Sequence, residues 1–255
     1  MSTEIRRTLT EYYRDEGIHP NHFTCKNQTI CRRHAHQEFM TETKMSMVGS
    51  QYAGAYPRIV VVSLDPPGGG REVPASKRVI AHLARTHEQH DYNRERPNVH
   101  WAMTQIIVSD ILTLFGYRAQ VGAAVVEESY AGRPIENVSA HFAHVNLAKC
   151  SMNNPRKKKA HEEVHRTCGE SYVIGELAIL QPEILITQGK SVNEILGKLL
   201  VDRPIELSEL PTTFDVKIAE MSALWCPMHH PARQLPLIRD SWPHYREKIG
   251  RQLRR

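Results

Sequence analysis

Three polar side chains, each placed just after an apolar run, are the residues of this sequence best suited to chemistry. Asp65 follows the run at 58–64, Asn146 lies near the end of the run at 142–147, and His230 comes shortly after a third run. The prolines after Asp65 lack an N–H and fix φ, so that loop is stiff and would hold the carboxylate in one place. The amide of Asn146 complements the edge of a nucleobase, and the imidazole of His230 can donate a hydrogen bond to an oxygen that gains negative charge.

Each of these residues also has an ordinary structural interpretation. Asp65 can cap a turn, and Asn146 can be a core amide whose hydrogen bonds are satisfied within the fold. His229 and His230 could bind a metal together, although adjacent side chains of an extended chain point in opposite directions. The glycines at 68–70 could offer N–H groups to a phosphate, but no Gly-Lys-Ser/Thr follows them as in a P-loop.

Apolar runs alternate with helical periodicity along most of the chain. The pattern predicts strands at 58–64, 142–147, 183–187, 214–218 and 221–226, and helices at 3–15, 76–88, 99–115, 160–180, 191–200 and 236–253. Such alternation is typical of an α/β fold, with a mostly parallel sheet covered by helices on both faces. Ligands of these sheets bind beyond the carboxyl ends of the strands, so we expect the loops at 65–70, 146–154 and 229–233 to converge there.

Length and composition set the limits of this interpretation. The chain has 255 residues, of which 40% are hydrophobic and 24% charged, which excludes wholesale disorder and fits a single domain over 1–255. Residues 1–50 are polar, and we expect them to form an N-terminal arm wrapped on the core. The start of the chain is charged and no apolar run reaches the roughly 18 residues of a membrane span, so we expect a soluble, cytoplasmic protein.

The charge balance favours polyanionic partners. Lys and Arg number 33 against 28 Asp and Glu, giving a net charge of +5 and a pI of about 9.0. One basic cluster is Arg156, Lys157, Lys158 and Lys159, and a second occupies the C-terminal stretch from Arg233. Either cluster alone could be a solvated helix face. Together they predict a sequence-independent, salt-sensitive grip on phosphates.

Five cysteines could ligate a metal, take part in catalysis or simply be buried. Their number is odd and no secretory signal is present, so a disulfide framework is not expected. Five residues separate Cys25 from Cys31, and seventeen separate Cys150 from Cys168. Four thiolates in two pairs suit a [4Fe–4S] cluster or a tetrahedral zinc ion, although Cys25 or Cys31 could also be free. Cys226 ends an apolar run and is expected to be a buried small hydrophobe.

Three sequence segments in order, together with the cysteines, resemble one known superfamily. The longest is Val145-Asn146-Leu147-Ala148-Lys149-Cys150, continuing through Cys168 to Leu180-Gln181-Pro182-Glu183-Ile184-Leu185-Ile186-Thr187-Gln188-Gly189-Lys190; the others are His230-Pro231-Ala232 and Ser63-Leu64-Asp65-Pro66-Pro67-Gly68. These are similar to the T-N-V-V-K-C segment, the H-P-S/A loop and the G-Q-D-P-Y or G-E-A-P-G motif of the uracil-DNA glycosylase superfamily. The likeness covers most of residues 57–233 and is closest to the iron–sulfur branch of bacteria and archaea.

The resemblance implies a role for each motif. The target nucleotide would be flipped out of the DNA, because its glycosidic bond cannot be reached inside the base stack. Asn146 would read the base edge, His230 would stabilise negative charge on the departing base, and Asp65 would position water or stabilise the cationic sugar. Arg233, with Arg156, Lys157 and Lys158, would contact DNA. A structural [4Fe–4S] cluster on Cys25, Cys31, Cys150 and Cys168 is also implied, with zinc as the alternative.

Departures from the family pattern concern the base pocket. Leu64 stands where the iron–sulfur branch has an acidic residue, and Asp65 instead matches the aspartate of the other branch. Pro67 replaces a tyrosine that shields the 5-position of the base, and the stretch around Val73 lacks the phenylalanine that stacks on uracil. Pro67 and Val73 therefore predict a reshaped pocket, for uracil or for a bulkier pyrimidine such as the glucosylated hydroxymethylcytosine of phage DNA. A few superfamily members act in defence against phages with such DNA.

The expected activity is that of a monomeric, monofunctional DNA glycosylase that hydrolyses the N-glycosidic bond and leaves an abasic site. No lysine presents itself as a Schiff-base nucleophile, so lyase activity is not expected. One alternative is a nucleic-acid binding module that keeps the fold with altered chemistry. Another is an unrelated α/β enzyme that acts on small nucleotides, suggested by the glycine-rich loop.

Overall fold

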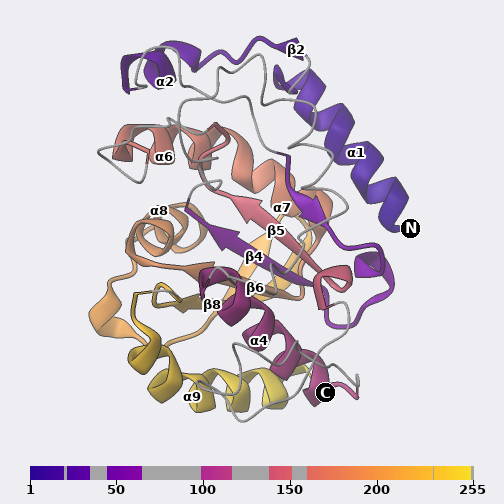
Figure 1. Ribbon diagram of the computed structural model, residues 1–255, viewed down its shortest axis with the longest axis vertical. Helices are drawn as coiled ribbons and strands as arrows, with labels where there is room; N and C mark the ends of the chain where they lie inside the picture. Colours follow the sequence, from indigo (N-terminus) through magenta and orange to yellow (C-terminus); the bar gives the residue numbers. More distant parts are fainter. Residues whose placement is uncertain are drawn as a thin grey trace.

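One mixed sheet forms the centre of the protein (Figure 1). The computed structural model describes residues 1–19, 22–34, 45–64, 99–116, 138–150, 160–231 and 233–253. Within these ranges the sheet has six strands, in the order β3 (Met47–Val48), β5 (Phe142–Asn146), β4 (Ile59–Ser63), β6 (Ile184–Gln188), β8 (Met221–Met228) and β7 (Phe214–Ile218). The four central strands are parallel, and the two edge strands β3 and β7 run antiparallel to their neighbours. The predicted α/β fold with a mostly parallel sheet is confirmed.

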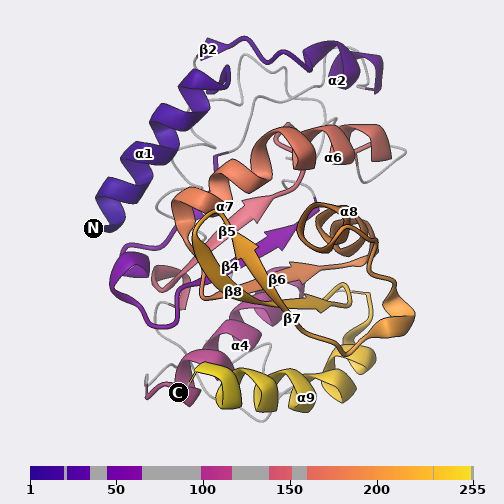
Figure 2. The same cartoon turned by 180° about the vertical axis from the view of Figure 1, so that it is seen from behind.

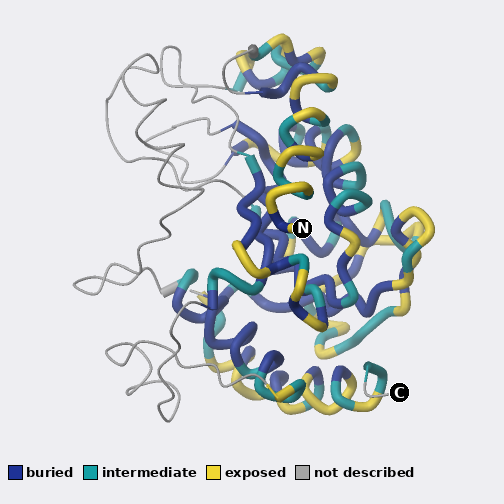
Figure 3. The backbone as a smooth tube through the Cα atoms, turned by 90° about the vertical axis from the view of Figure 1, so that its right-hand side faces the viewer, coloured by how far each residue is buried: buried dark blue, intermediate teal, exposed yellow. Residues whose placement is uncertain are grey.

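The central strands are buried on both faces. Every residue of β4, β5 and β6 is buried, as expected for the continuous apolar runs of parallel strands covered on both sides. Alternate side chains enter two separate cores, so Val60 and Val62 pack on one face while Ile59 and Val61 pack on the other. Figure 3 shows this buried centre and the exposed outer sides of the surrounding helices.

Helices from both halves of the chain cover the first face (Figure 2). They are α1 (Ser2–Asp15), α6 (Glu162–Cys168), α7 (Ile174–Leu180) and α8 (Lys190–Val201), with one π turn (Gly169–Val173) between α6 and α7. The sequence predicts a single helix at 160–180, and the structure places this wider turn in its middle. A π turn contains more residues than a normal helical turn, so the side chains that follow it point in a different direction. Such turns are frequent at functional sites.

Among the described residues, two helices cover the second face. α4 (Val99–Leu114) and α9 (Leu235–Leu253) lie below the sheet in Figure 1. Apolar side chains of both pack on the strands, and Trp242 of α9 donates a hydrogen bond of 2.7 Å to Asp110 of α4. Cys226 is fully buried in this core, as expected for a small apolar side chain.

Residues of the N-terminal arm pack against the first face. After α1 come a short hairpin of β1 (Ile18–His19) and β2 (His22–Phe23), then α2 (Gln28–His34) and the edge strand β3. Leu9, Tyr13 and Ile18 belong to the same core as α7 and α8. Short 3-10 turns lie at Tyr52–Gly54, Val138–Ala140 and Leu207–Glu209. Among the described helices, none is long and apolar enough to span a lipid bilayer.

Candidate functional site

Polar side chains gather at the carboxyl ends of the parallel strands. Asn146 is the last residue of β5, and His229 and His230 follow β8, so all three lie at the edge predicted for ligand binding. β4 and β6 separate β5 from β8, so Asn146 and the end of β8 stand three strand spacings apart, about 14 Å.

Two buried polar atoms at this edge have no hydrogen-bond partner among the described residues. They are Oδ1 of Asn146 and Nδ1 of His229, on side chains that are largely shielded from solvent. A buried polar atom without a partner costs about 1–3 kcal/mol, so proteins rarely retain one without a reason. A bound molecule that offers a donor and an acceptor would satisfy both.

A hydrogen-bonded network joins the strand ends between these two positions. Ser63 ends β4 and donates a 3.0 Å hydrogen bond to Gln188, which ends β6. Gln188 in turn bonds Thr104 of α4 at 2.9 Å, and His144 of β5 lies 2.9 Å from Ser63. The floor of the site is therefore polar and fixed by partners on α4 and on three strands. Sequence reasoning missed these residues, although Gln188 shows the same signal as Asn146, a polar side chain at the end of an apolar strand.

The first turn of α4 brings a further histidine to the site. The ring of His100 lies 5.0 Å from that of His230, centroid to centroid. Burial, with a smaller effect from His230, lowers the pKa of His100 to about 4, so it is neutral at physiological pH. Burial and then the charge of Arg233 also lower the pKa of His230. A neutral imidazole keeps one N–H and can donate it to an oxygen that becomes negative.

Backbone geometry holds this side of the site close together. Gly189 has φ of 101°, a region that favours glycine, and a Cβ there would lie 3.5 Å from the ring of His230. The N–H of Gly189 bonds the carbonyl of Met228 at 2.9 Å, and α8 begins at the next residue. Arg233, which is exposed, donates its backbone N–H to the carbonyl of His230 at 3.1 Å. The amino ends of α4 and α8 thus both point their positive dipoles toward this edge.

Several predicted site residues lie outside the described ranges: Asp65, Pro67 and Val73 in 65–98, and Arg156, Lys157 and Lys158 in 151–159. The predicted helix at 76–88 lies there as well. The described chain stops at Leu64, whose carbonyl accepts a hydrogen bond of 2.9 Å from the N–H of Ala148. Leu64, the residue before Asp65, therefore lies beside the loop that follows Asn146.

The four cysteines predicted as ligands share one buried region under the arm. Cys25 and Cys31 come from the arm, Cys150 follows Asn146 by four residues, and Cys168 ends α6. Cys31 donates a hydrogen bond to Cys168, which, together with burial and interactions with the other three thiols, raises the pKa of Cys31. The same hydrogen bond, with one from the backbone N–H of Lys149, lowers the pKa of Cys168.

The spacing of these thiols bears on what they could hold. No three of their sulfur atoms, all within the described chain, lie within 4.8 Å of one another. A tetrahedral zinc ion with Zn–S bonds of about 2.3 Å needs its sulfur atoms closer, at about 3.8 Å. Thiols are also the ligand type of iron–sulfur clusters, so the four buried cysteines supply the right donor chemistry without being gathered around a common centre. Tyr172, in the π turn, lies 3.0 Å from the sulfur of Cys25, so this turn also faces the cysteine region.

A buried charged pair connects the cysteine region to the candidate site. Lys149 donates a hydrogen bond of 2.7 Å to the backbone carbonyl of Asn146 and forms a short ion pair with Glu176 of α7. Both side chains are almost fully buried, which lowers the pKa of Lys149 to about 7 and raises that of Glu176 well above its usual value. Tyr13 of α1 and Ser46 also donate to the carboxyl group of Glu176. The arm is therefore linked through two side chains to the strand end that carries Asn146.

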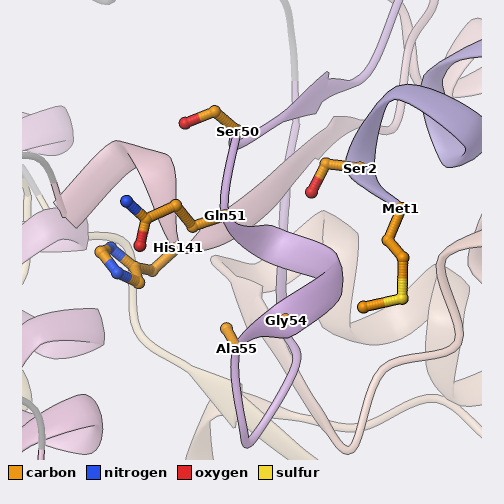
Figure 4. A pocket seen from close by; sticks show the side chains of 7 residues that line it. All are labelled: Met1, Ser2, Ser50, Gln51, Gly54, Ala55 and His141. Carbon is orange, nitrogen blue, oxygen red and sulfur yellow. The ribbon is translucent and has the colours of Figure 1, made fainter.

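A pocket of about 440 Å³ opens at the opposite edge of the sheet (Figure 4). Its walls are the start of α1, the segment before β4 and the residue before β5, namely Met1, Ser2, Ser50, Gln51, Gly54, Ala55 and His141. These residues lie at the amino ends of β4 and β5, away from Asn146 and His230. Its lining contains one imidazole, that of His141, and otherwise uncharged side chains.

Comparison with models of known protein families, and with curated proteins, finds no match to this chain.

Proposed function

We propose that this protein is a DNA glycosylase that hydrolyses the N-glycosidic bond of a pyrimidine nucleotide flipped out of the strand. The observation that carries the proposal is the amide oxygen of Asn146, which is buried at the end of β5 and has no hydrogen-bond partner among the described residues. A carboxamide has one acceptor and two donors in one plane, which match the N–H and carbonyl groups on the pairing edge of uracil. Flipping is required because enzymes that act on a base must take it out of the stack.

His230 would stabilise the departing base from the other side. As the glycosidic bond breaks, negative charge accumulates on the pyrimidine ring, including its O2 atom. The pKa of His230 is lowered, so its imidazole is neutral. A neutral imidazole can still donate one N–H hydrogen bond to this oxygen. The amino ends of α4 and α8 add positive potential at the same place. Because removing one preorganised donor typically costs about 10²–10³ in rate, the His230 side chain should be essential.

Basic groups around the site would bind the flanking phosphates. Arg233 is exposed next to the His230 turn, and Lys190 opens α8 with its side chain in solvent. Both lie at the edge where the base would enter. Together with Arg156, Lys157 and Lys158 they would bind DNA phosphates, which gives the positive net charge of the chain a role. Asp65 would position the attacking water or stabilise the cationic sugar.

The cysteine region would serve as a structural anchor for this machinery. We propose that Cys25, Cys31, Cys150 and Cys168 hold a [4Fe–4S] cluster. When bound, the cluster supplies structural cross-linking between the arm and the loop after Asn146. The chain itself then contributes the hydrogen bond from Lys149 that holds the carbonyl of Asn146.

The substrate class follows from the residues that replace the aromatic groups of the resembled family. Pro67 and Val73 would leave more space at the 5-position than tyrosine and phenylalanine do. Uracil and bulkier modified cytosines, such as glucosylated hydroxymethylcytosine, are therefore the substrates to compare. Action on the modified base would place the protein in defence against phages that carry it.

The test is release of a free base, identified by mass spectrometry, from duplex and single-stranded DNA that contains uracil, hydroxymethylcytosine or its glucosylated form. Asn146→Asp and His230→Ala should each lower the rate at least about 10²-fold while DNA binding in a gel shift is retained. His244→Ala, which changes a histidine in the middle of α9 beside Tyr245, is the matched control and should act like the parent protein. DNA binding without release of any base from the panel would reject the proposal in favour of a binding module, and hydrolysis of free nucleotides would favour a small-nucleotide enzyme.

A further inference from the structure

A second group of metal-binding side chains lies between α2 and α6, outside the proposed glycosylase site. It consists of His34, His161 and Glu163, and one ligand atom of each lies within 4.8 Å of the other two. Nε2 of His34 is 2.6 Å from Oε2 of Glu163. The rings of His34 and His161 stack face to face, with centroids 3.8 Å apart and planes 3° from parallel. We call this group the His–Glu cluster.

Local structure fixes where each member stands. His34 is the last residue of α2, and His161 caps the amino end of α6 by accepting a hydrogen bond of 3.2 Å from the N–H of Glu163. The side chains of His34 and Glu163 are 18% and 29% exposed, so an ion from solvent can reach them. The two helices approach through side chains that lie far apart in the sequence, which is typical of a built site rather than of a local charge pair.

The ligand set fits a divalent transition metal. Two imidazoles and one carboxylate are the donors that Zn²⁺ takes at sites with an open position for water. Oε2 of Glu163 faces the ring of His34 at 2.6 Å, so the carboxylate is placed to act as a ligand. Arg33 lies 3.5 Å from Oε1 of Glu163 and would orient the carboxylate while Oε2 faces the ion.

We propose that the His–Glu cluster binds one divalent transition-metal ion of the zinc class and thereby fastens the arm to α6. The ion would replace the proton that now bridges His34 and Glu163. A metal lies in the plane of each ligating ring, so the parallel stack must open on binding. His161 is the exposed member and is the ring that turns, giving up its bond to the backbone N–H of Glu163.

The location gives the ion a structural role. Cys31 lies one turn before His34 on α2, and Cys168 ends the helix on which Glu163 stands. Cys31 and Cys168 hydrogen-bond to each other, so the His–Glu cluster and the thiols join the same two helices at two places. An ion at the outer position would stabilise the closed arrangement of α2 on α6 and slow the opening of the cysteine region.

Cobalt(II) is the probe that separates this site from the cysteines. The full-length protein, purified with whatever its cysteines hold and freed of loosely bound metal, is titrated with Co²⁺ and followed by absorption. One equivalent should bind with the weak visible bands of nitrogen and oxygen ligands and without a sulfur-to-cobalt charge-transfer band in the near ultraviolet. Zn²⁺ should displace it. His34→Ala, His161→Ala and Glu163→Gln should each weaken binding by at least about tenfold.

Matched variants make the result decisive. Glu162→Gln removes the same charge one residue away on an exposed side chain, and it should leave the affinity for Co²⁺ unchanged. If His34→Ala does not fold, His161→Ala changes a surface side chain and carries the same test. A charge-transfer band, or equal affinity in the parent and the His161→Ala and Glu163→Gln variants, would overturn the proposal. These readouts need no glycosylase activity, so they are independent of the proposed function.

Discussion

Replacing Lys149 with methionine tests how the protein accommodates a buried charge beside its candidate site. The ammonium group donates to the carbonyl of Asn146 and to Glu176, and the side chain of Lys149 is only 2% exposed. Methionine keeps most of the apolar volume, so lost packing should contribute little. The carboxyl group of Glu176 would keep Tyr13 and Ser46 as donors but lose its cation. Breaking a buried pair in this way costs about 3–5 kcal/mol, a large part of the roughly 5–15 kcal/mol that stabilises a domain.

The loss should grow as the pH rises. Burial already raises the pKa of Glu176, and removing the buried cation raises it further. A carboxyl group with a higher pKa in the folded chain contributes its full stability below the unfolded pKa, and this contribution is lost as pH rises through the folded pKa. Tyr12, which also faces Glu176, stays neutral in this range because burial raises its pKa. Lys149→Met should therefore lose up to about 1.4 kcal/mol of stability per pH unit as the pH rises above the unfolded pKa of a glutamate, about 4.3, so it should be less stable at pH 8 than at pH 5.

Equilibrium unfolding in urea at pH 5 and pH 8 measures this change in stability. The compared proteins must have equal metal content, because loss of bound metal lowers stability independently. The double variant Lys149→Met/Glu176→Gln is the matched control. A neutral amide cannot titrate, so the double variant should show no pH dependence from this site and should recover about 2 kcal/mol at the higher pH. If Lys149→Met lies within about 1 kcal/mol of the parent, or if the two substitutions are additive, the pair does not act as a unit and the reasoning is refuted.

Three further substitutions test other parts of the structure. Gly189→Ala places a Cβ on a residue with φ of 101° and should lower the urea midpoint by the equivalent of about 1–2 kcal/mol; an unchanged midpoint would contradict the strain. Trp225→Phe removes an indole N–H that donates to Thr187 at 2.9 Å, and it should lower stability by about 1–3 kcal/mol in the same assay; an unchanged midpoint would contradict a stabilising role of this bond. Cys31→Ser should lower the iron content of the purified protein while Cys226→Ala leaves it unchanged; equal iron in both would remove Cys31 from the proposed ligand set.

The sequence predicts the centre of the fold well because continuous apolar runs have few alternatives to buried strands. All five predicted strands are present, with ends that differ by no more than two residues from those expected. The edge strand β3 has two residues, Met47 and Val48, and two residues are too few to show the alternating pattern by which a strand is recognised. The π turn within 160–180 is equally invisible, because one wider turn barely changes the spacing of apolar residues.

The sequence predicts a residue of the candidate site only where the signal lies within a single segment of the chain. Asn146 is singled out because a polar residue ends an apolar strand. Cys168 is singled out by the resemblance to a known superfamily, and its role as a ligand stays a prediction. The bonds of Ser63 to Gln188 and of Gln188 to Thr104 depend on β4 lying between β5 and β6, and the pattern of apolar residues does not specify strand order. Lys149 is similar, since a lysine is buried only when a distant partner compensates it.

The arrangement gives a reason for the polar arm that opens the chain. The described start of the loop after Asn146 places Leu147 and Ala148 in the core, and it also carries Lys149, which bonds the carbonyl of Asn146, and the thiol of Cys150. The arm supplies the groups that complete both interactions, with Tyr13 and Ser46 on Glu176 and Cys25 and Cys31 beside the other thiols. Because a buried polar group is stable only when all its partners are present, loss of the arm's contacts should loosen Asn146 before it unfolds the sheet. Under the proposed function, residues that never touch the base would then control how it is recognised.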